Sequence, residues 1–294
     1  MPRAALLSIH ARVEKTEPTS WEHPSLVQLW GPRFSNYVVA AKDLAVFSLG
    51  RLPIDTRRIA RANDAASRLH ALLKGRRIPF GQAGRDMGVM HNSLRYGAPT
   101  GRVLIRWDGA KQPHVWTVAA PAMDPQQARL ELARRYLHIF GPSTPTSFAD
   151  WAGIQPVQAR SVWHALAGEL ASVRTPIGDA WILADDEAAF RVLSGGSAPA
   201  RLLPSGDTYF LLWGPDRSLL VPDAKRRAAL WTTRVWPGAL LVNGEIVGIW
   251  RRSAAEISIE AWRRLSRAER NAAEAEALSL PLPALKGPVA VRWS

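Results

Sequence analysis

The sequence predicts an α+β protein made of small helical units that each end in a β-hairpin, followed by a strand-rich domain. Three observations lead to this expectation. Three helices and a hairpin are clearest between Asp124 and Leu183, the same order recurs more weakly in residues 46–120, and strand patterns dominate after residue 186. With 294 residues and 47% hydrophobic side chains, the chain is long enough for several packed cores.

The composition excludes several classes of protein. The chain has no cysteine, which removes thiol nucleophiles, disulfides and cysteine-bound zinc. Its apolar runs fall short of the ~18 residues that a membrane-spanning helix needs, and residues 1–10 lack the long apolar stretch of a signal peptide. We therefore expect a cytoplasmic protein without membrane attachment.

Positive charge is concentrated in the first part of the chain. The formal net charge is +13; residues 1–120 hold 18 basic and 8 acidic side chains, whereas residues 121–184 hold 5 of each. Most of the basic residues are arginines, whose planar set of N–H donors suits phosphate oxygens. A codon bias would spread through the chain, whereas a polyanion-binding surface concentrates charge. The distribution favours nucleic acid as the partner and a nucleoid-associated location.

The unit at residues 121–185 has the clearest signals. Helices are expected from Asp124 to Phe140, from Thr146 to Ala152 and from Pro156 onward, followed by a hairpin over residues 171–183 with its turn at Gly178-Asp179. Asp124 is a good N-cap, and proline is favoured in the first helical turn. Three helices followed by a hairpin is the order of a winged helix.

The unit at residues 46–120 repeats this order. It is expected to contain a helix from Thr56 to Leu73, two short helices within the glycine-broken stretch from Gly81 to Asn92, and strands Arg102–Trp107 and His114–Val118 around an Asp108-Gly109 turn. We interpret it as a second, basic winged helix.

Residues 1–45 resemble the back half of a third copy. The patterns predict a helix from Ala4 to Glu14 and a hairpin of Leu26–Trp30 with Tyr37–Ala40. The opening helices of such a unit are missing, so we expect this first winged helix to be N-terminally incomplete. It would carry the candidate active-site motif.

Residues 186–294 predict an antiparallel β-barrel-like domain with two helices. Strands are expected at Arg201–Leu212, Ala239–Val242, Ile246–Trp250, Glu256–Ile259 and Val289–Trp293, and helices at Asp223–Trp231 and Ser266–Leu278. The Asn243-Gly244 pair is a strong hairpin signal. Ser266 and Glu269 have the spacing of a capping box.

Several segments resemble a known family. They are LLSIHARVE, SLVQLWGPRFSNYVVA, FGPSTPTSFADWAGI, RLLPSGDTYFLLWGPDR and PGALLVNGEIVGIW. On these stretches the chain resembles the winged-helix DNA-binding family that includes the AlkZ/YcaQ-type DNA glycosylases. The resemblance implies tandem winged helices and a C-terminal β-barrel that clamp double-stranded DNA. It also implies a DNA-repair hydrolase that excises alkylated purines or unhooks crosslinks; the alternative is a non-enzymatic binder, either a transcription regulator or a damage-shielding protein.

The chain departs from this family at the catalytic signature, a Gln-x-Gln or Gln-x-Asp motif. His10 stands where the first Gln would be, and Arg12 stands where the second Gln or the Asp would be. The active site must hold a water molecule and tolerate the positive charge that develops on the sugar. A guanidinium cannot act as a base and would raise the energy of a nearby cation unless a phosphate neutralised it. His10 can accept a proton near neutral pH; the alternatives are DNA binding without cleavage and a structural or phosphate-contacting role for both residues.

Other residues are candidates for DNA contact, with ordinary solvated or core positions as the alternative. They are Trp30, as an exposed stacking residue, with Arg33 beside it, Arg57, Arg61 and Arg68 on one face of their helix, Arg76 and Arg77 after its end, and Arg106 in the hairpin. The histidines lack metal-binding spacing, so we expect no metal and no cofactor. We expect a monomer.

Overall fold

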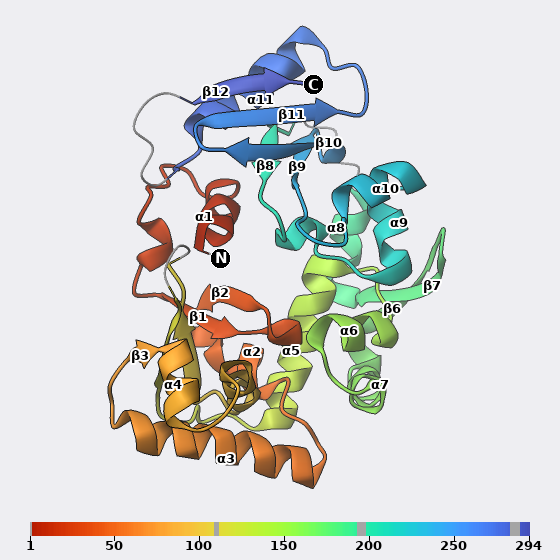
Figure 1. The fold of residues 1–294 in the computed structure, drawn as a ribbon. Coiled ribbons are helices and arrows are strands. Elements are labelled where there is room, and N and C mark those ends of the chain that lie inside the picture. The colour runs from red at the N-terminus through yellow and green to blue at the C-terminus, as the bar shows by residue number, and fades with distance from the viewer. Residues whose placement is uncertain (1, 109–111, 193–197, 283–288) are drawn as a thin grey trace. The chain divides into compact units, whose positions relative to one another are not determined.

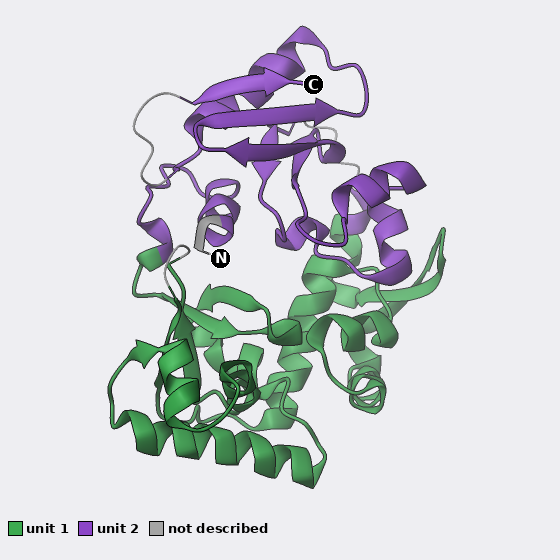
Figure 2. Cartoon of the chain, viewed as in Figure 1, with its two compact units in different colours: residues 1–2, 22–189 green, residues 3–21, 190–294 purple. Residues whose placement is uncertain are grey.

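A computed structural model describes residues 2–108, 112–192, 198–282 and 289–294 (Figure 1). The chain divides into two compact units, coloured separately in Figure 2. Unit 1 comprises residues 1–2 and 22–189, and unit 2 comprises residues 3–21 and 190–294. Among the described helices, none has the length and apolar character to cross a membrane.

Unit 1 begins with the predicted hairpin. Strands β1 (Leu26–Trp30) and β2 (Asn36–Ala40) pair antiparallel, with Trp30 opposite Asn36. The following elements are α2 (Leu44–Leu49), α3 (Thr56–Leu73), β3 (Ile78–Pro79), α4 (Phe80–Asp86), the 3-10 segment η4 (His91–Thr100), β4 (Val103–Arg106) and β5 (His114–Thr117). The three strands form a sheet in the order β3-β5-β4. The predicted helix at 56–73 and both hairpin strands are confirmed, whereas Gly109 of the predicted turn lies outside the described residues.

The second half of unit 1 contains the predicted three helices and hairpin. They are α5 (Pro125–Phe140), α6 (Pro145–Ala152), α7 (Pro156–Ala165), β6 (Leu170–Thr175) and β7 (Gly178–Leu183). The Asp124 side chain caps α5 by accepting N–H bonds from Gln126 and Gln127. The predicted turn position is wrong: Thr175 pairs with Gly178, so the turn lies at residues 176–177.

Two buried arginines join the two halves of unit 1. Arg51 donates from Nη1 to the Trp30 carbonyl (2.8 Å) and from Nε to the Ala152 carbonyl (3.0 Å). Burial lowers the pKa of Arg51 to about 10. Arg129 of α5 donates to the carbonyls of Gly50 (3.2 Å) and Leu52 (2.6 Å). Backbone carbonyls therefore satisfy both guanidinium groups inside the unit.

Unit 2 is built on a five-stranded sheet. Its strands are β8 (Arg201–Leu203), β9 (Gly238–Val242), β10 (Glu245–Ser253), β11 (Glu256–Ala261) and β12 (Ala290–Trp293), in the order β12-β11-β10-β9-β8. Its helices are α1 (Pro2–His10), whose part from Arg3 onward belongs to this unit, α9 (Arg217–Leu220), α10 (Ala224–Leu230) and α11 (Arg267–Ser279); α8 (Glu187–Arg191) runs across the sequence boundary with unit 1. Asn243 and Gly244 both have positive φ, as the predicted hairpin turn requires.

The predicted barrel is wrong. The five described strands form an open sheet, and β11 pairs with β12 in parallel rather than antiparallel. Helix α11 contacts both edge strands, β8 and β12. Its Ala273 and Ala277 lie in one core with Leu202, Ile257 and Ile259. The helix therefore buries the apolar side of the sheet without closure of the strands.

Two other predicted elements are shorter than expected. The strand expected at Arg201–Leu212 ends at Leu203, because Pro204 cannot donate to a ladder and Gly206 adopts φ of 74°. The helix expected at Ala4–Glu14 ends at His10. Both ends lie beside the side chains described next.

Candidate functional site

The His10-Ala11-Arg12 segment leaves the end of α1 within unit 2. Leu7 and Ala11 pack into the apolar cores of this unit. They fix the segment beside a recess with a volume of about 370 Å³. Its lining combines residues 10–15 with Arg201, Glu276 and Ser279. The recess is therefore polar and carries both signs of charge.

Hydrogen bonds define the state of the His10 ring. Its Nε2 lies 3.1 Å from Ser279 Oγ and 4.0 Å from Glu276 Oε2. The Ser279 hydroxyl donates its single proton to the Glu276 carbonyl (2.8 Å), so it accepts the bond from Nε2–H. This assignment leaves the lone pair of the neutral ring on Nδ1. That atom is buried and has no hydrogen-bond partner within the described residues.

The Glu276 carboxylate is buried and is bound by a backbone N–H and an arginine. Oε1 accepts the backbone N–H of Leu202 (3.2 Å), and Oε2 lies 3.4 Å from Nη1 of Arg201. Nε of Arg201 also donates to the Ala11 carbonyl (3.0 Å). Arg201 thus ties the motif segment and α11 to the start of β8. A buried acid is stabilised in this way by a cation and a backbone donor.

Arg12 forms a bidentate ion pair with Asp207. Its Nη1 and Nη2 lie 2.9 Å and 2.7 Å from the two carboxylate oxygens, and the Asp207 side chain is fully buried. Asp207 also accepts the Ser8 hydroxyl (2.6 Å) and the Tyr209 N–H (2.8 Å). The hydrogen bonds to Asp207 raise the pKa of Arg12 above its ordinary value. A carboxylate, rather than the phosphate considered from the sequence, neutralises this guanidinium in the free chain.

In unit 1, three predicted contact residues lie along α3. Arg57, Arg61 and Arg68 are exposed and fall within one side of the helix. Arg57 and Arg61 have no side-chain hydrogen bond or ion pair within the described residues. Arg68 lies 3.7 Å from the exposed Asp64 carboxylate and donates to the Met87 carbonyl (3.1 Å). This group of three, the α3 arginine row, leaves two guanidinium groups available to anions.

The other predicted arginines have partners inside unit 1. Arg76 donates to the carbonyls at the end of α3, and the Arg77 guanidinium lies 4.3 Å from the Trp116 ring centre. Arg106 forms ion pairs with Asp108 (3.1 Å) and Glu22 (3.3 Å). Arg33 donates to the Asp150 carbonyl (2.9 Å). Their role in DNA contact stays a prediction.

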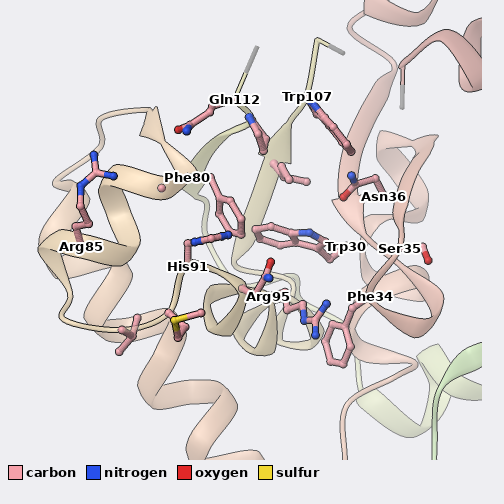
Figure 3. A pocket seen from close by; sticks show the side chains of 16 residues that line it. Trp30, Phe34, Ser35, Asn36, Phe80, Arg85, His91, Arg95, Trp107 and Gln112 are labelled. Atoms are coloured by element: carbon pink, nitrogen blue, oxygen red, sulfur yellow. The ribbon is translucent and has the colours of Figure 1, made fainter. Parts of the chain in front are cut away.

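The expectation that Trp30 is exposed is wrong. Its exposed fraction is 5%, and its ring centre lies 5.3 Å from that of Phe80. Trp30 belongs to the core that also contains Leu69 and Val115. It nevertheless lines a cavity of about 860 Å³ in unit 1, shown in Figure 3. A stacking role at Trp30 stays a prediction.

The sequence analysis did not identify the two acids and the serine that contact the motif segment in unit 2. Asp207, Glu276 and Ser279 come together with residues 8–12 from segments more than 190 residues away. Glu276 carried a weak signal, because it is a charged residue between the core alanines Ala273 and Ala277 of α11. Among all the described residues, including this recess, no group of three or more histidines or acids is placed to hold a metal ion.

Comparison with known proteins identifies the family to which the chain belongs. A family model described as DNA glycosylase AlkZ-like matches residues 1–280, so the chain belongs to the AlkZ-like DNA glycosylase family. The chain is also similar in structure to Streptomyces sahachiroi DNA glycosylase AlkZ, with a TM-score of 0.75 and 16% sequence identity over 99% of this chain and 89% of that chain. At this identity the likeness shows the fold. No curated protein matches the sequence. The resemblance seen in the sequence is confirmed.

Proposed function

We propose that the protein is a DNA glycosylase that hydrolyses the N-glycosidic bond of alkylated purines in double-stranded DNA, with His10 as the proton acceptor. Its membership of the AlkZ-like family supports the reaction class. One observation carries the assignment of the site: Ser279 and Glu276 hold one nitrogen of His10, and the other nitrogen has no partner within the described residues.

The reaction requires little acid catalysis, because an N-alkylated purine is already cationic. The water oxygen bonds to the sugar C1′, and the C1′–N bond breaks with its electron pair remaining on the purine, which leaves neutral. One water proton passes to Nδ1 of His10. The Glu276 carboxylate, 4.0 Å from Nε2, stabilises the resulting imidazolium. The proposal requires the DNA complex to admit one water to Nδ1, which is shielded in the free chain.

Arg12 acts in this proposal as a positioning residue. Its charge is balanced by the buried Asp207 carboxylate, so it does not raise the energy of a cationic sugar as an isolated guanidinium would. Arg12 also donates to the Ser8 carbonyl (2.8 Å), four residues earlier in the turn that carries His10. The Arg12–Asp207 ion pair and this hydrogen bond thereby fix the backbone conformation of residues 8–12.

The α3 arginine row is the proposed contact to the DNA backbone. We also propose that residues 46–120 and 121–185 are two winged helices, since each contains helices followed by an antiparallel strand pair. Phosphate contacts of this kind position a protein on a duplex without reading its sequence. They suit an enzyme that recognises a damaged base rather than an operator.

A base-release assay tests the proposal. The full chain is incubated with a duplex that contains 7-methylguanine, and hot alkali then breaks the strand at abasic sites. We expect breaks above the no-protein control. His10→Ala should lower the rate by about 100-fold or more, and Glu276→Gln by about 10-fold. The exposed His164, which is in unit 1, supplies the control variant His164→Ala.

Duplex affinity, measured in parallel, separates the alternatives. His10→Ala should leave duplex affinity nearly unchanged. An equal loss of base release and affinity would assign His10 a structural role. Absence of breaks at saturating protein would remove the glycosylase proposal and favour a non-enzymatic DNA-binding protein.

A further inference from the structure

A lysine lines the same recess of unit 2 as His10. Residues 10–15 form one wall of this recess, whose volume is about 370 Å³, and Lys15 supplies a primary amine to the lining. The Lys15 side chain is exposed and has no hydrogen bond or ion pair within the described residues. The two arginines of the lining, Arg12 and Arg201, are instead bound to buried carboxylates. The fold therefore leaves the Lys15 amine available to a ligand of the recess.

Backbone bonds fix the position of this lysine relative to the motif segment. Lys15 has φ of 56°, a left-handed conformation that is uncommon for residues other than glycine. It lies in a turn closed by the Thr16 hydroxyl, which donates to the Val13 carbonyl (2.7 Å). The Val13 N–H donates to the Ile9 carbonyl (2.8 Å), within the last turn of α1. The turn that carries Lys15 is thus tied directly to the helix end that carries His10.

A carboxylate without a partner lines the recess beside this lysine. Glu14 is exposed and has no hydrogen bond or ion pair within the described residues. The other acid of the lining, Glu276, is buried and bound to Arg201 and a backbone N–H. Glu14 is therefore the carboxylate of the lining that is placed to accept a proton from a ligand.

The product of base excision has a carbonyl group that an amine can attack. Removal of a base leaves an abasic deoxyribose, and its ring-opened form is an aldehyde at C1′. Lysine amines form Schiff bases with carbonyl groups. A sugar held in the recess beside His10 would have a primary amine and a carboxylate on the same wall. Holding the reacting groups together in this way favours their reaction.

We propose that Lys15 gives the protein a second activity, the cleavage of DNA strands at abasic sites by β-elimination. The lone pair of Nζ bonds to C1′ of the aldehyde, and loss of one water leaves a protonated imine. The Glu14 carboxylate takes a proton from C2′, the electron pair of that C–H bond forms a C2′=C3′ double bond, and the C3′–O bond breaks so that the phosphate leaves with its electron pair. Water then hydrolyses the imine and returns the free amine, so the steps are redox-neutral.

This inference rests on the proposed function for the source of the abasic site, but its test does not. A duplex with one preformed abasic site, made by removal of a uracil, is incubated with the full chain, and sodium borohydride reduces the imine to a stable amine. We expect a covalent protein–DNA adduct on a denaturing gel and, without borohydride, strand breaks that need no alkali. Peptide mapping should place the adduct on Lys15.

Variants at this position test the amine itself. Lys15→Arg keeps the positive charge but removes the primary amine, so the adduct yield should fall by about 10-fold or more. Lys15→Asn should give the same loss with a residue that tolerates positive φ. Because the chain has no cysteine, Lys15→Cys can be alkylated at this position alone with 2-bromoethylamine, which restores a primary amine and should recover the adduct. The control is Lys225→Arg, at an exposed position of α10, which should leave the yield unchanged.

Glu14→Gln separates the two chemical steps. This variant should leave the adduct yield nearly unchanged and slow strand cleavage by about 10-fold or more. No adduct at saturating protein, an adduct on another amine, or equal yields from the unaltered chain and Lys15→Arg would overturn the proposal. A chain that releases 7-methylguanine but forms no adduct would keep the glycosylase function and lose this second activity alone. An adduct at Lys15 without base release would support the strand-cleaving activity and remove the glycosylase proposal.

Discussion

The outer side of α3 and the recess of unit 2 use arginine in different ways. On α3, Arg57 and Arg61 are exposed and have no hydrogen bond or ion pair within the described chain. In unit 2, Arg12 and Arg201 each contact a carboxylate that is itself buried. A free guanidinium can release counterions from DNA, whereas one that is paired with a buried acid is part of the fold. Net charge along the sequence therefore does not show which arginines can bind phosphate.

The strongest test of this contrast removes the α3 arginine row. Arg57→Ala, Arg61→Ala and Arg68→Ala together should weaken duplex binding by about 100-fold or more near 0.1 M salt, and should reduce the slope of log K against log salt by about one unit per lost phosphate contact. The measurement is a titration of duplex DNA at several salt concentrations.

A comparison of two single variants, each of which removes one positive charge, makes this test more specific. Arg134 forms a bidentate pair with Glu169 (2.7 and 2.8 Å), so Arg134→Ala removes one positive charge from an arginine that is already paired. Arg61→Ala should reduce the salt slope, and Arg134→Ala should leave it nearly unchanged. Equal slopes for these two variants would place the DNA-binding surface elsewhere.

The second test concerns the buried pair of unit 2. Asp207→Asn removes the charge that balances Arg12 and weakens the bonds from Ser8 and Tyr209, so the free energy of unfolding should fall by about 2–3 kcal/mol. Urea unfolding of the full chain measures this loss.

The matched control is a pair of similar length at the surface. Arg174 and Asp179 lie 2.6 Å apart with side chains 81% and 68% exposed, so Asp179→Asn should cost less than about 1 kcal/mol. If the two variants were equally stable, the Arg12–Asp207 pair would have no special structural role.

The smallest expected effect is pH-dependent and concerns Glu269 in the capping box of α11. The Arg263 guanidinium and the Ser266 N–H lower the pKa of Glu269 to about 2. Since the pKa is lower in the folded state, the stabilisation is fully present above about 4.5 and is lost as the pH falls toward 2. Glu269→Gln should therefore lower the melting temperature slightly at pH 7 and make little difference at pH 2. A difference that is constant over this range would contradict an ionic contribution.

Local signals made much of the fold predictable from the sequence. The caps at Asp124 and Ser266 and the Asn243-Gly244 turn each act within a few residues, and the structure confirms all three. Whether the C-terminal sheet is open or closed into a barrel was not predictable in this way, since it depends on which distant strands pair. The parallel pairing of β12 with β11 and the packing of α11 across the sheet have no signature in any short window.

The candidate site was predictable only in part. The motif position of His10 could be found from the resemblance, but its partners Glu276 and Ser279 lie about 270 residues further along the chain. The burial of Trp30 likewise results from Phe80, which the sequence places 50 residues later. Contacts of this kind require the tertiary structure.

The carbonyl bonds of the buried Arg51 and Arg129 have a practical consequence for dividing the molecule into fragments. A fragment that stopped at residue 120 would retain Arg51 but lose the Ala152 carbonyl, and a fragment that started at residue 121 would retain Arg129 but lose both of its acceptors. Each fragment would therefore contain a guanidinium group, Arg51 or Arg129, that is buried in the whole chain but has lost one or more of its hydrogen-bond acceptors. Truncation at this boundary should therefore give insoluble material, and chimeras should exchange residues 22–189 as one block, which keeps both arginines with all of their acceptors.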